Sequence, residues 1–164
     1  MAEPINAIRT MLTKDVISSK LASAYVTVDG KRYLLFQAKK LEATVEKNKQ
    51  EVYILGRPMA GSRATGMSGK GTLTIYYNTS MFVKMMLNYK RTGEDTFFDI
   101  QATNYDPASS AGKQTIILKN CNLDSLPLGA FDAEGSWLEQ EIPFTFDDFE
   151  VPEEFTELDG MTVG

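Results

Sequence analysis

One stretch of the sequence constrains the fold more than any other. Residues 41–55 have the composition of a single β-strand, although an ordinary strand has only about 5–6 residues. One face of this strand is polar throughout, and the opposite face offers only Ala43 and Val45 as plain apolar groups. A long strand that is polar on both faces has a weakly specified register and an edge that other strands can join. We therefore expect it to line an aqueous lumen and to pair with copies of itself, which indicates an assembly protein rather than an enzyme.

A glycine-rich segment, GRPMAGSRATGMSGKG, follows at residues 56–71. It predicts an extended flexible loop, and docking of this loop on a neighbouring subunit would offset the entropy that glycine loses on ordering. The segment does not match a phosphate-binding P-loop. The position that needs glycine ahead of Lys70 holds Ala64, and Gly71 stands where serine or threonine is required.

The composition fits one soluble globular domain. A chain of 164 residues with 43% hydrophobic and 24% charged residues is ordinary for that class. A chain of this length buries roughly 70% of its unfolded surface. No apolar stretch approaches the ~20 residues that a membrane span needs. The N-terminal segment also lacks the apolar core of a signal peptide, because Arg9, Lys14, Asp15 and Lys20 interrupt it.

The chain has no histidine and only one cysteine, Cys121. This excludes Ser-His-Asp and Cys-His catalysis, HExxH sites and thiolate zinc sites. With a single cysteine no internal disulfide can form, which fits assembly in a reducing cytoplasm. Cys121 lies in an apolar run and is expected to be a buried structural thiol. The acidic pairs Glu139 with Glu141 and Asp147 with Asp148 fit solvated strand faces better than acid/base catalysis. We expect no catalytic residue, no cofactor, no metal and no small-molecule substrate.

Charge is distributed unevenly along the chain. Residues 1–119 hold all 17 Lys and Arg against 10 Asp and Glu, whereas residues 120–164 hold 12 acidic residues and no basic one. The acidic end fits a solvated, extended tail. It also fits complementary charge for head-to-tail contact between identical subunits. Charge alone leaves both interpretations open, while the scattered basic residues disfavour nucleic-acid binding.

Strand signals elsewhere predict a mainly β fold with one helix. Residues 24–36 read as a hairpin around Asp29-Gly30. Further strands are expected at 97–105, 114–123 and 137–149, and Pro143 in the last of these suggests an edge or a bulge. The sum is an antiparallel β-sandwich or barrel. We divide the chain at the following boundaries: an N-terminal arm for inter-subunit contact at 1–23, the β domain at 24–158 with its extended loop at 56–71, and a flexible C-terminus at 159–164.

Residues 80–91 predict the helix, with Ser80 as N-cap and Gly93 as the C-terminal stop. It is apolar around most of its circumference, so it is buried on more than one side. That pattern fits either an ordinary core helix or a helix that also meets a partner subunit. Its expected packing face consists of Phe82, Met85, Met86 and Tyr89.

Several sequence blocks in a fixed order carry a family resemblance. They are VISSKLASAYVTVDG at 16–30, LEATVEKNKQEVYILGRPMAGSRATGMSGKGTLTIYY at 41–77, SMFVKMMLNYKRTGEDTFFDIQA at 80–102 and EIPFTFDDFEVPEEF at 141–155. Through these blocks the chain resembles the tail tube (core tail) proteins of PBSX-like contractile phage tails and of related phage-tail-like bacteriocins. The resemblance spans residues 16–158.

The resemblance implies a structural protein whose subunits form hexameric rings, and these rings stack into a hollow tube. Strands from all subunits of a ring would join into one continuous β-barrel. The implied partners are further copies of the chain, a contractile sheath protein, baseplate and tail-terminator proteins, and a tape measure protein and DNA passing through the lumen. The implied location is a virion or phage-tail-like particle assembled in the bacterial cytoplasm.

Two groups of residues are candidates for the working surfaces of such a tube. The candidates for the lumen wall, a hydrophilic and negative surface, are Glu42, Thr44, Glu46, Thr72, Thr74, Glu141 and Thr145. The candidates for contacts between subunits or rings are the cations Arg57, Arg63 and Lys70 and the acids Glu150, Glu153 and Glu154. Two alternatives stay open from the residues: a monomeric β-barrel that binds a small molecule, and the inner tube of a type VI-like secretion system.

Overall fold

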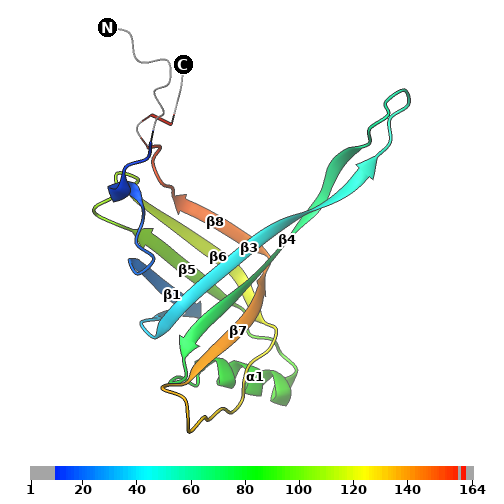
Figure 1. The fold of residues 1–164 in the computed structure, drawn as a ribbon. Coiled ribbons are helices and arrows are strands. Elements are labelled where there is room, and N and C mark those ends of the chain that lie inside the picture. Colours follow the sequence, from blue (N-terminus) through cyan, green and yellow to red (C-terminus); the bar gives the residue numbers. More distant parts are fainter. Residues whose placement is uncertain (1–9, 159, 162–164) are drawn as a thin grey trace.

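The structure, a computed structural model, describes residues 10–158 and 160–161. An antiparallel sheet of eight strands makes up most of this part, and one α-helix lies at its lower end in Figure 1. The strands are β1 Ala22–Val28, β2 Lys31–Leu34, β3 Ala38–Val52, β4 Gly61–Tyr76, β5 Phe98–Tyr105, β6 Lys113–Leu123, β7 Glu139–Phe146 and β8 Asp148–Glu153. The helix α1 spans Met81–Thr92, and a 3-10 turn, η1, spans Thr13–Asp15.

The sheet folds into two layers that share β6. Its strand order is β2-β1-β5-β6-β7-β4-β3, and β8 pairs with β6 beside this path. β6 pairs with β5 and β8, and it reaches β7 only through Asn122 and Leu123. One layer therefore consists of β1, β2, β5, β6 and β8, and β3, β4 and β7 cross it as the second (Figure 1). The predicted mainly β, antiparallel fold with one helix is confirmed.

The core fills the space between the two layers. Its most buried aliphatic side chains, each at most 1% exposed, are Val26, Ile75, Ile100, Leu73 and Ile142. Burying a side chain of this size stabilises the fold by about 1.5–3 kcal/mol. The helix closes one end of this core, because Phe82 is fully buried and meets the ring of Phe98 edge-on with centroids 6.0 Å apart.

The local signals for turns and helix ends are confirmed. Asp29 and Gly30 both have positive φ, at 49° and 78°, as a tight type I′ hairpin turn requires. Gly93 ends α1 in the left-handed conformation, and its N–H donates to the carbonyl of Tyr89. Ser80 is the N-cap residue, but its side chain makes no capping hydrogen bond.

Only part of the predicted packing face of α1 is buried. Phe82 and Met85 are buried and Met86 is half-buried, whereas Tyr89 is 48% exposed. Tyr89 lines a shallow recess beside Leu123 and does not enter the core. The helix thus packs through its first two turns, and its last turn is exposed.

The glycine-rich segment is mostly strand, so the loop predicted at 56–71 is wrong from Gly61 onward. β4 begins at Gly61 and pairs with β3 as far as Ala38↔Ile75, which leaves only residues 53–60 as the connecting turn. β3 itself lies slightly earlier than the predicted 41–55. From Gly61 the main chain pairs with β3, and from Gly69 it pairs with β7 as well, so these glycines act as strand residues.

The strand predicted at 137–149 is divided into β7 and β8. The break falls at Asp147, beside Asn120 of β6, which has a positive φ of 54°. The predicted edge at Pro143 is local: β7 pairs with β4 along its length but with β6 only through Phe144 and Thr145, so among the described residues no strand pairs with its other side from Pro143 back to Glu139. The ladder to β6 stops at Pro143, whose carbonyl accepts from Asp124 N–H but which has no N–H to return.

The two terminal segments are held by one turn between β5 and β6. Asp15 Oδ1 accepts hydrogen bonds from the Ser110 main-chain N–H and hydroxyl at 3.0 and 2.7 Å. Thr156 donates its N–H to the carbonyl of Ala111 at 2.8 Å. The predicted arm at 1–23 also overlaps β1, which begins at Ala22. Its residues 1–9 and most of the predicted C-terminus at 159–164 lie outside the described residues.

Candidate assembly interface

One face of the β3-β4-β7 layer brings together all the residues predicted to line a lumen. The cross-strand register pairs Glu42 with Thr72, Glu46 with Ser68, and Thr74 with Glu141. Since alternate residues of a strand share a face, the set lies on the side of the layer that faces away from the core. We call this surface the polar face; its predicted members are Glu42, Thr44, Glu46, Thr72, Thr74, Glu141 and Thr145.

The other face of the same layer belongs to the core. Leu41 lies opposite Leu73, and Leu73 lies opposite Ile142. Two residues further along, Gly71 lies opposite Phe144. The layer is thus amphipathic, with its apolar side against the other layer and its polar side turned away from the core.

The polar face carries both signs of charge, which sequence reasoning missed. Lys70 pairs in register with Thr44 and Thr145 and approaches Glu46 at 4.0 Å. Lys40 approaches Glu42 at 3.7 Å. Both ion pairs are exposed and each contributes only ~0–1 kcal/mol, but they place a cation beside two of the three predicted carboxylates, Glu42 and Glu46.

Two further details change the predicted surface. Thr74 is only 8% exposed, so it offers little to a solvent-filled lumen. Beside it, Lys39 donates to Glu139, and Trp137 Nε1 donates to the same carboxylate oxygen at 2.7 Å. The hydrogen bond from Lys39, with a smaller contribution from Trp137, holds the pKa of Glu139 below its usual range. The Glu139 contact in turn raises the pKa of Lys39.

β3 exposes an unpaired edge along its whole length. It is the last strand of the order and pairs only with β4, so no other strand among the described residues pairs with its outer edge from Ala38 to Val52. Such an edge is a template for another strand. The strand is 15 residues long, which gives this edge the capacity for a long intermolecular ladder.

Past the core, β3 and β4 continue as a free hairpin. β7 ends where Phe146 pairs with Gly69, and beyond this point the two strands pair only with each other. Figure 1 shows this hairpin projecting away from the body of the molecule. Its turn, residues 53–60, exposes the large apolar side chains of Tyr53, Leu55 and Met59. We call these turn residues the hairpin tip.

The predicted inter-subunit charges do not meet within one chain. Glu150 accepts from Lys119 at 2.8 Å, and Glu153 lies 3.3 Å from Lys113. The Glu150 hydrogen bond raises the pKa of Lys119. In the described part of the chain, Glu154 forms no ion pair, and neither do the hairpin residues Arg57 and Arg63. The acids are thus partly engaged already, and the hairpin cations are not.

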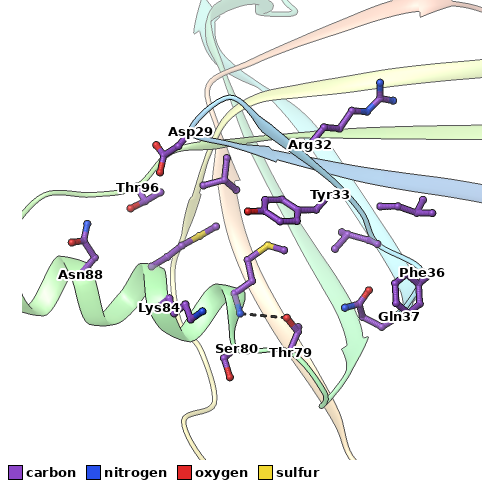
Figure 2. A pocket seen from close by; sticks show the side chains of 15 residues that line it. Asp29, Arg32, Tyr33, Phe36, Gln37, Thr79, Ser80, Lys84, Asn88 and Thr96 are labelled. Carbon is purple, nitrogen blue, oxygen red and sulfur yellow. Dashed lines mark hydrogen bonds between the residues drawn. The ribbon is translucent and has the colours of Figure 1, made fainter.

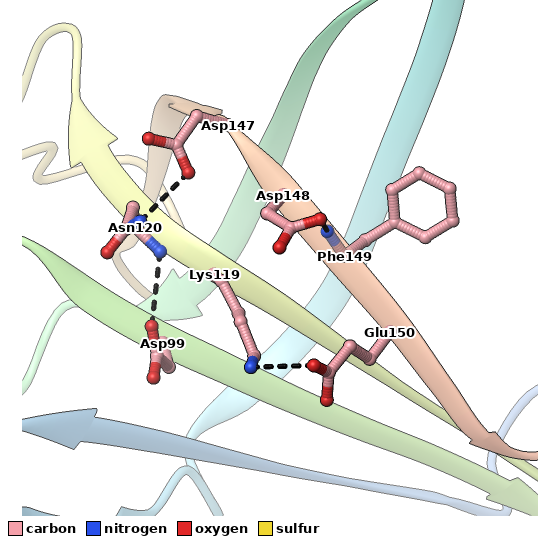
Figure 3. Close-up of polar contacts among 7 residues, drawn as sticks. All are labelled: Asp99, Lys119, Asn120, Asp147, Asp148, Phe149 and Glu150. Carbon is pink, nitrogen blue, oxygen red and sulfur yellow. Dashed lines mark hydrogen bonds and ion pairs between the residues drawn. The ribbon is translucent and has the colours of Figure 1, made fainter.

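A residue that the sequence analysis passed over positions the acidic strand β8. Asn120 donates its main-chain N–H to Asp99 Oδ1 at 3.1 Å and its side-chain amide to Asp147 Oδ1 at 3.0 Å (Figure 3). These bonds join β5, β6 and the point where β7 passes into β8. The only sequence signal would have been an asparagine inside an otherwise β-rich run, since asparagine tolerates positive φ.

The described residues hold no group of three or more His, Cys, Asp or Glu side chains that could bind a metal ion. Their one α-helix is not long or apolar enough to cross a membrane. Cys121 is fully buried, and burial raises the pKa of its thiol to about 12. The predicted structural role of this cysteine agrees with its place in the core.

Solved structures share this arrangement of strands. The chain matches the tube of an extracellular contractile injection system, the PVC sheath-tube complex, with a TM-score of 0.65 and 17% identity over 85% of this chain and 93% of the other. It also matches the SPP1 tail tube, with a TM-score of 0.61 and 10% identity over 86% and 81% of the two chains. These similarities define the fold class of the chain as that of tube-forming tail subunits.

Sequence comparison identifies the family. The family model described as phage tail tube protein matches residues 9–153. A relative from Bacillus subtilis (strain 168), the phage-like element PBSX protein XkdM, is 42% identical over 138 residues, which cover 80% of this chain and 94% of the relative. The chain belongs to the phage tail tube protein family, and its role is structural. The predicted resemblance is confirmed, and the family replaces the alternative of a monomeric ligand-binding barrel.

Proposed function

We propose that the chain forms hexameric rings that stack into the inner tube of a contractile tail, with the polar face of β3, β4 and β7 lining the lumen. The observation that carries this proposal is the combination in β3 of an unpaired edge and a polar face. Those two properties are a liability for a monomer. Both are accounted for when copies of the chain close into a common barrel, since closure removes free edges.

Main-chain pairing supplies much of the cohesion of such a ring. Each net intermolecular hydrogen bond contributes about 0.5–1.5 kcal/mol, and β3 offers a 15-residue edge for them. Exposed ion pairs at the rim contribute ~0–1 kcal/mol each. The ladder therefore provides the strength of the ring, and charge contributes to its register and specificity.

The polar face suits a conduit because it offers little for a cargo to bind. The carboxylates Glu42 and Glu46 repel phosphate, and each has a lysine beside it, so neither sign of charge forms a continuous track. Threonine hydroxyls supply hydration without charge. A tape measure protein and DNA could pass such a wall without the phosphate attraction that a basic wall would exert.

The outer surfaces are then available to other tail components. Sheath-tube, baseplate and terminator complexes are among the solved structures to which this chain is similar. By this analogy we assign the protein partners in a contractile sheath, a baseplate and a tail terminator, and a location in a tail-like particle.

Electron microscopy of the purified chain tests the proposal. At high concentration, or after seeding with tail tips, we expect rings with six-fold symmetry and hollow tubes in negative stain. A matched experiment adds an excess of a variant whose β3–β4 hairpin is truncated. Incorporation of this variant should shorten the tubes. Monodisperse monomers under all these conditions, in a chain that is folded by circular dichroism, would contradict the proposal.

A further inference from the structure

Aromatic and acidic side chains meet at the end of the polar face that lies away from the hairpin, where β4 ends and β7 begins (Figure 1). Glu139 and Glu141 are two residues apart on β7 and therefore share this face. Tyr76 lies directly opposite Glu139 in the ladder. Trp137 reaches the same place, because its Nε1 donates to Glu139 Oε1 at 2.7 Å. We call Tyr76, Trp137, Glu139 and Glu141 the aromatic cluster.

The indole of Trp137 is held in place but remains exposed. The Glu139 oxygen that accepts from Trp137 also accepts from Lys39, so the indole is tied to an ion pair. The Glu139 hydrogen bond is the main cause of the raised pKa of Lys39, and Tyr76 adds a smaller electrostatic contribution from beside it. Trp137 is nevertheless 64% exposed and Tyr76 39% exposed. Since the single N–H of the indole is already used, the surface that Trp137 offers to a ligand is its ring face.

The charges around the aromatic cluster favour a cationic ligand. Lys39 compensates Glu139, whereas Glu141 is exposed and forms no ion pair within the described part of the chain. One uncompensated carboxylate therefore stands beside two aromatic rings. An aromatic face attracts a cation through its quadrupole, most strongly in tryptophan, and a carboxylate attracts the same sign of charge. Lysine and arginine side chains combine such a cation with an apolar stem that packs on a ring.

A groove beside α1 adjoins the aromatic cluster but has the opposite charge. It has a volume of about 890 Å³ and is lined by Gln37, whose carbonyl accepts from Tyr76 N–H. The charged side chains that line it are Asp29, Arg32 and Lys84 (Figure 2), two cations against one anion. The groove therefore does not compete with the aromatic cluster for a cationic ligand.

The chemistry of the site separates a polypeptide from DNA as its ligand. Duplex DNA presents phosphates, which Glu141 repels, and its stacked bases are closed to the ring of Trp137. A polypeptide with basic side chains meets neither obstacle. Four strand residues separate Trp137 from Glu141, which is about 13 Å. Residues i and i+8 of an α-helix are about 12 Å apart, so a helix with basic residues at this spacing can reach both positions.

We propose that the aromatic cluster binds lysine and arginine side chains of a helical polypeptide that occupies the lumen. One cation lies over the indole of Trp137, and a second pairs with Glu141. This inference rests on the proposed tube, because the tube turns the polar face toward a threaded chain. The cluster then holds a polypeptide cargo weakly, at one level of each ring, on a wall that otherwise lets cargo pass.

The fluorescence of Trp137 tests the site in the unsubstituted protein, because the chain has no other tryptophan. The probe is a helical peptide with arginine at every eighth residue, and its control has glutamine at those positions. Tubes assembled with the arginine peptide should show weaker quenching of Trp137 by acrylamide, and the glutamine peptide should leave the quenching unchanged. Equal protection by both peptides, or protection by duplex DNA in place of the arginine peptide, would overturn the proposal.

Two substitutions assign the binding to the aromatic cluster. Trp137→Ala and Glu141→Gln should each weaken binding of a labelled arginine peptide by roughly two- to fivefold, measured by fluorescence anisotropy. Glu141→Gln leaves the hydrogen bonds of Glu139 untouched, so it tests the site even where Trp137→Ala disturbs them. The matched controls are Tyr105→Ala, a tyrosine of β5 that is 49% exposed, and Glu94→Gln in the loop after α1. Equal losses in the controls would overturn the assignment.

Free subunits separate this site from the tube itself. Trp137 is exposed in the single chain, so the same titration can be made below the concentration at which tubes form. Tubes that form normally but show neither protection of Trp137 nor an effect of the substitutions overturn the site and leave the tube proposal intact. Subunits that bind the arginine peptide at Trp137 but never form rings or tubes support the site and contradict the tube.

Discussion

Gly71 lies directly beneath the ring of Phe144. A Cβ at position 71 would stand 2.6 Å from Phe144 Cζ and 2.7 Å from the carbonyl oxygen of Glu42 on the neighbouring strand. Gly69 has the same relationship to Phe146 two residues away. The aromatic side chains of β7 thus rest on the bare backbone of β4, and glycine is required there by packing.

Substituting Gly71 with alanine should therefore destabilise the fold. The carbonyl oxygen belongs to rigid backbone, so the added methyl group forces a shift of the ring or of the strand, at a cost of about 1–3 kcal/mol. Chemical denaturation of Gly71→Ala measures this loss. Gly66→Ala is the matched control, because it lies on the same strand with open space around its Cβ position. Equal midpoints for the two variants would contradict the packing argument.

These glycines show why the sequence misled us about residues 61–71. Glycine spacing is a local signal, and it reads as a loop when its neighbours are polar. The reason why positions 69 and 71 require glycine is non-local. Phe146 and Phe144 belong to β7, and only the folded sheet places their rings against these glycines. Glycine in a strand marks close approach of another group, but the sequence does not name that group.

The features that were predicted correctly depend on neighbouring residues alone. The Asp29-Gly30 turn and the end of α1 at Gly93 need only the conformational freedom of those residues. The face of β3 also followed from simple alternation. Lys40 was left out of that face because the predicted strand began at residue 41, whereas β3 begins at Ala38 and pairs Lys40 with Thr74 on the same face as Glu42.

Asn120 should be more sensitive to alanine than to glycine. Its φ of 54° is strained for alanine but free for glycine. Both changes remove the side-chain bond to Asp147. We expect a loss of about 1–3 kcal/mol for Asn120→Ala and roughly half of that for Asn120→Gly. Thermal or chemical unfolding of both variants gives the comparison. A larger loss of unfolding free energy for Asn120→Gly than for Asn120→Ala would show that the positive φ of residue 120 causes no strain in the alanine variant.

Attachment of the N-terminal segment should weaken in acid. The main-chain N–H and the hydroxyl of Ser110 bond to the carboxylate of Asp15 and hold its pKa below the usual 3.8. A carboxyl whose pKa is lowered by folding stabilises the folded state above its unfolded pKa, and this contribution disappears as the pH falls through the folded pKa. Cleavage by pepsin near residues 10–21 should therefore rise as the pH falls below about 4.

Two variants identify Asp15 as the responsible group. Asp15→Asn carries no titrating carboxyl, so its cleavage near residues 10–21 should depend much less on pH over the same range. Asp29→Asn removes an exposed carboxylate that accepts no hydrogen bond in the described part of the chain, and it should behave like the unsubstituted protein. If cleavage of Asp15→Asn rose at the same pH, the hydrogen bonds between Asp15 and Ser110 would not be the cause of the acid sensitivity.

Charge reversal on the polar face should affect cargo and leave assembly largely intact. Glu42 and Glu46 are exposed, and their side chains make only long ion pairs. Glu42→Lys with Glu46→Lys should yield normal tubes that bind short DNA duplexes in a salt-dependent manner and slow DNA passage. The matched control, Glu94→Lys with Asp95→Lys, makes the same change of charge on the loop after α1. Equal DNA retention by both variants would contradict the assignment of this face to the lumen.

The cations of the hairpin should act on stacking, whereas Lys70 should not. Arg57 and Arg63 are unpaired within the described residues, while Lys70 lies on the polar face beside Glu46. An exposed ion pair contributes ~0–1 kcal/mol, so reversing both arginines to glutamate should raise the critical concentration for tube formation by up to about fivefold per pair. The increase should shrink at high salt, because screening weakens exposed pairs. Sedimentation of tubes over a concentration series measures this, with Lys70→Glu as the control. If Lys70→Glu raised the critical concentration and the double arginine variant did not, the stacking charge would have to lie on the polar face instead of the hairpin.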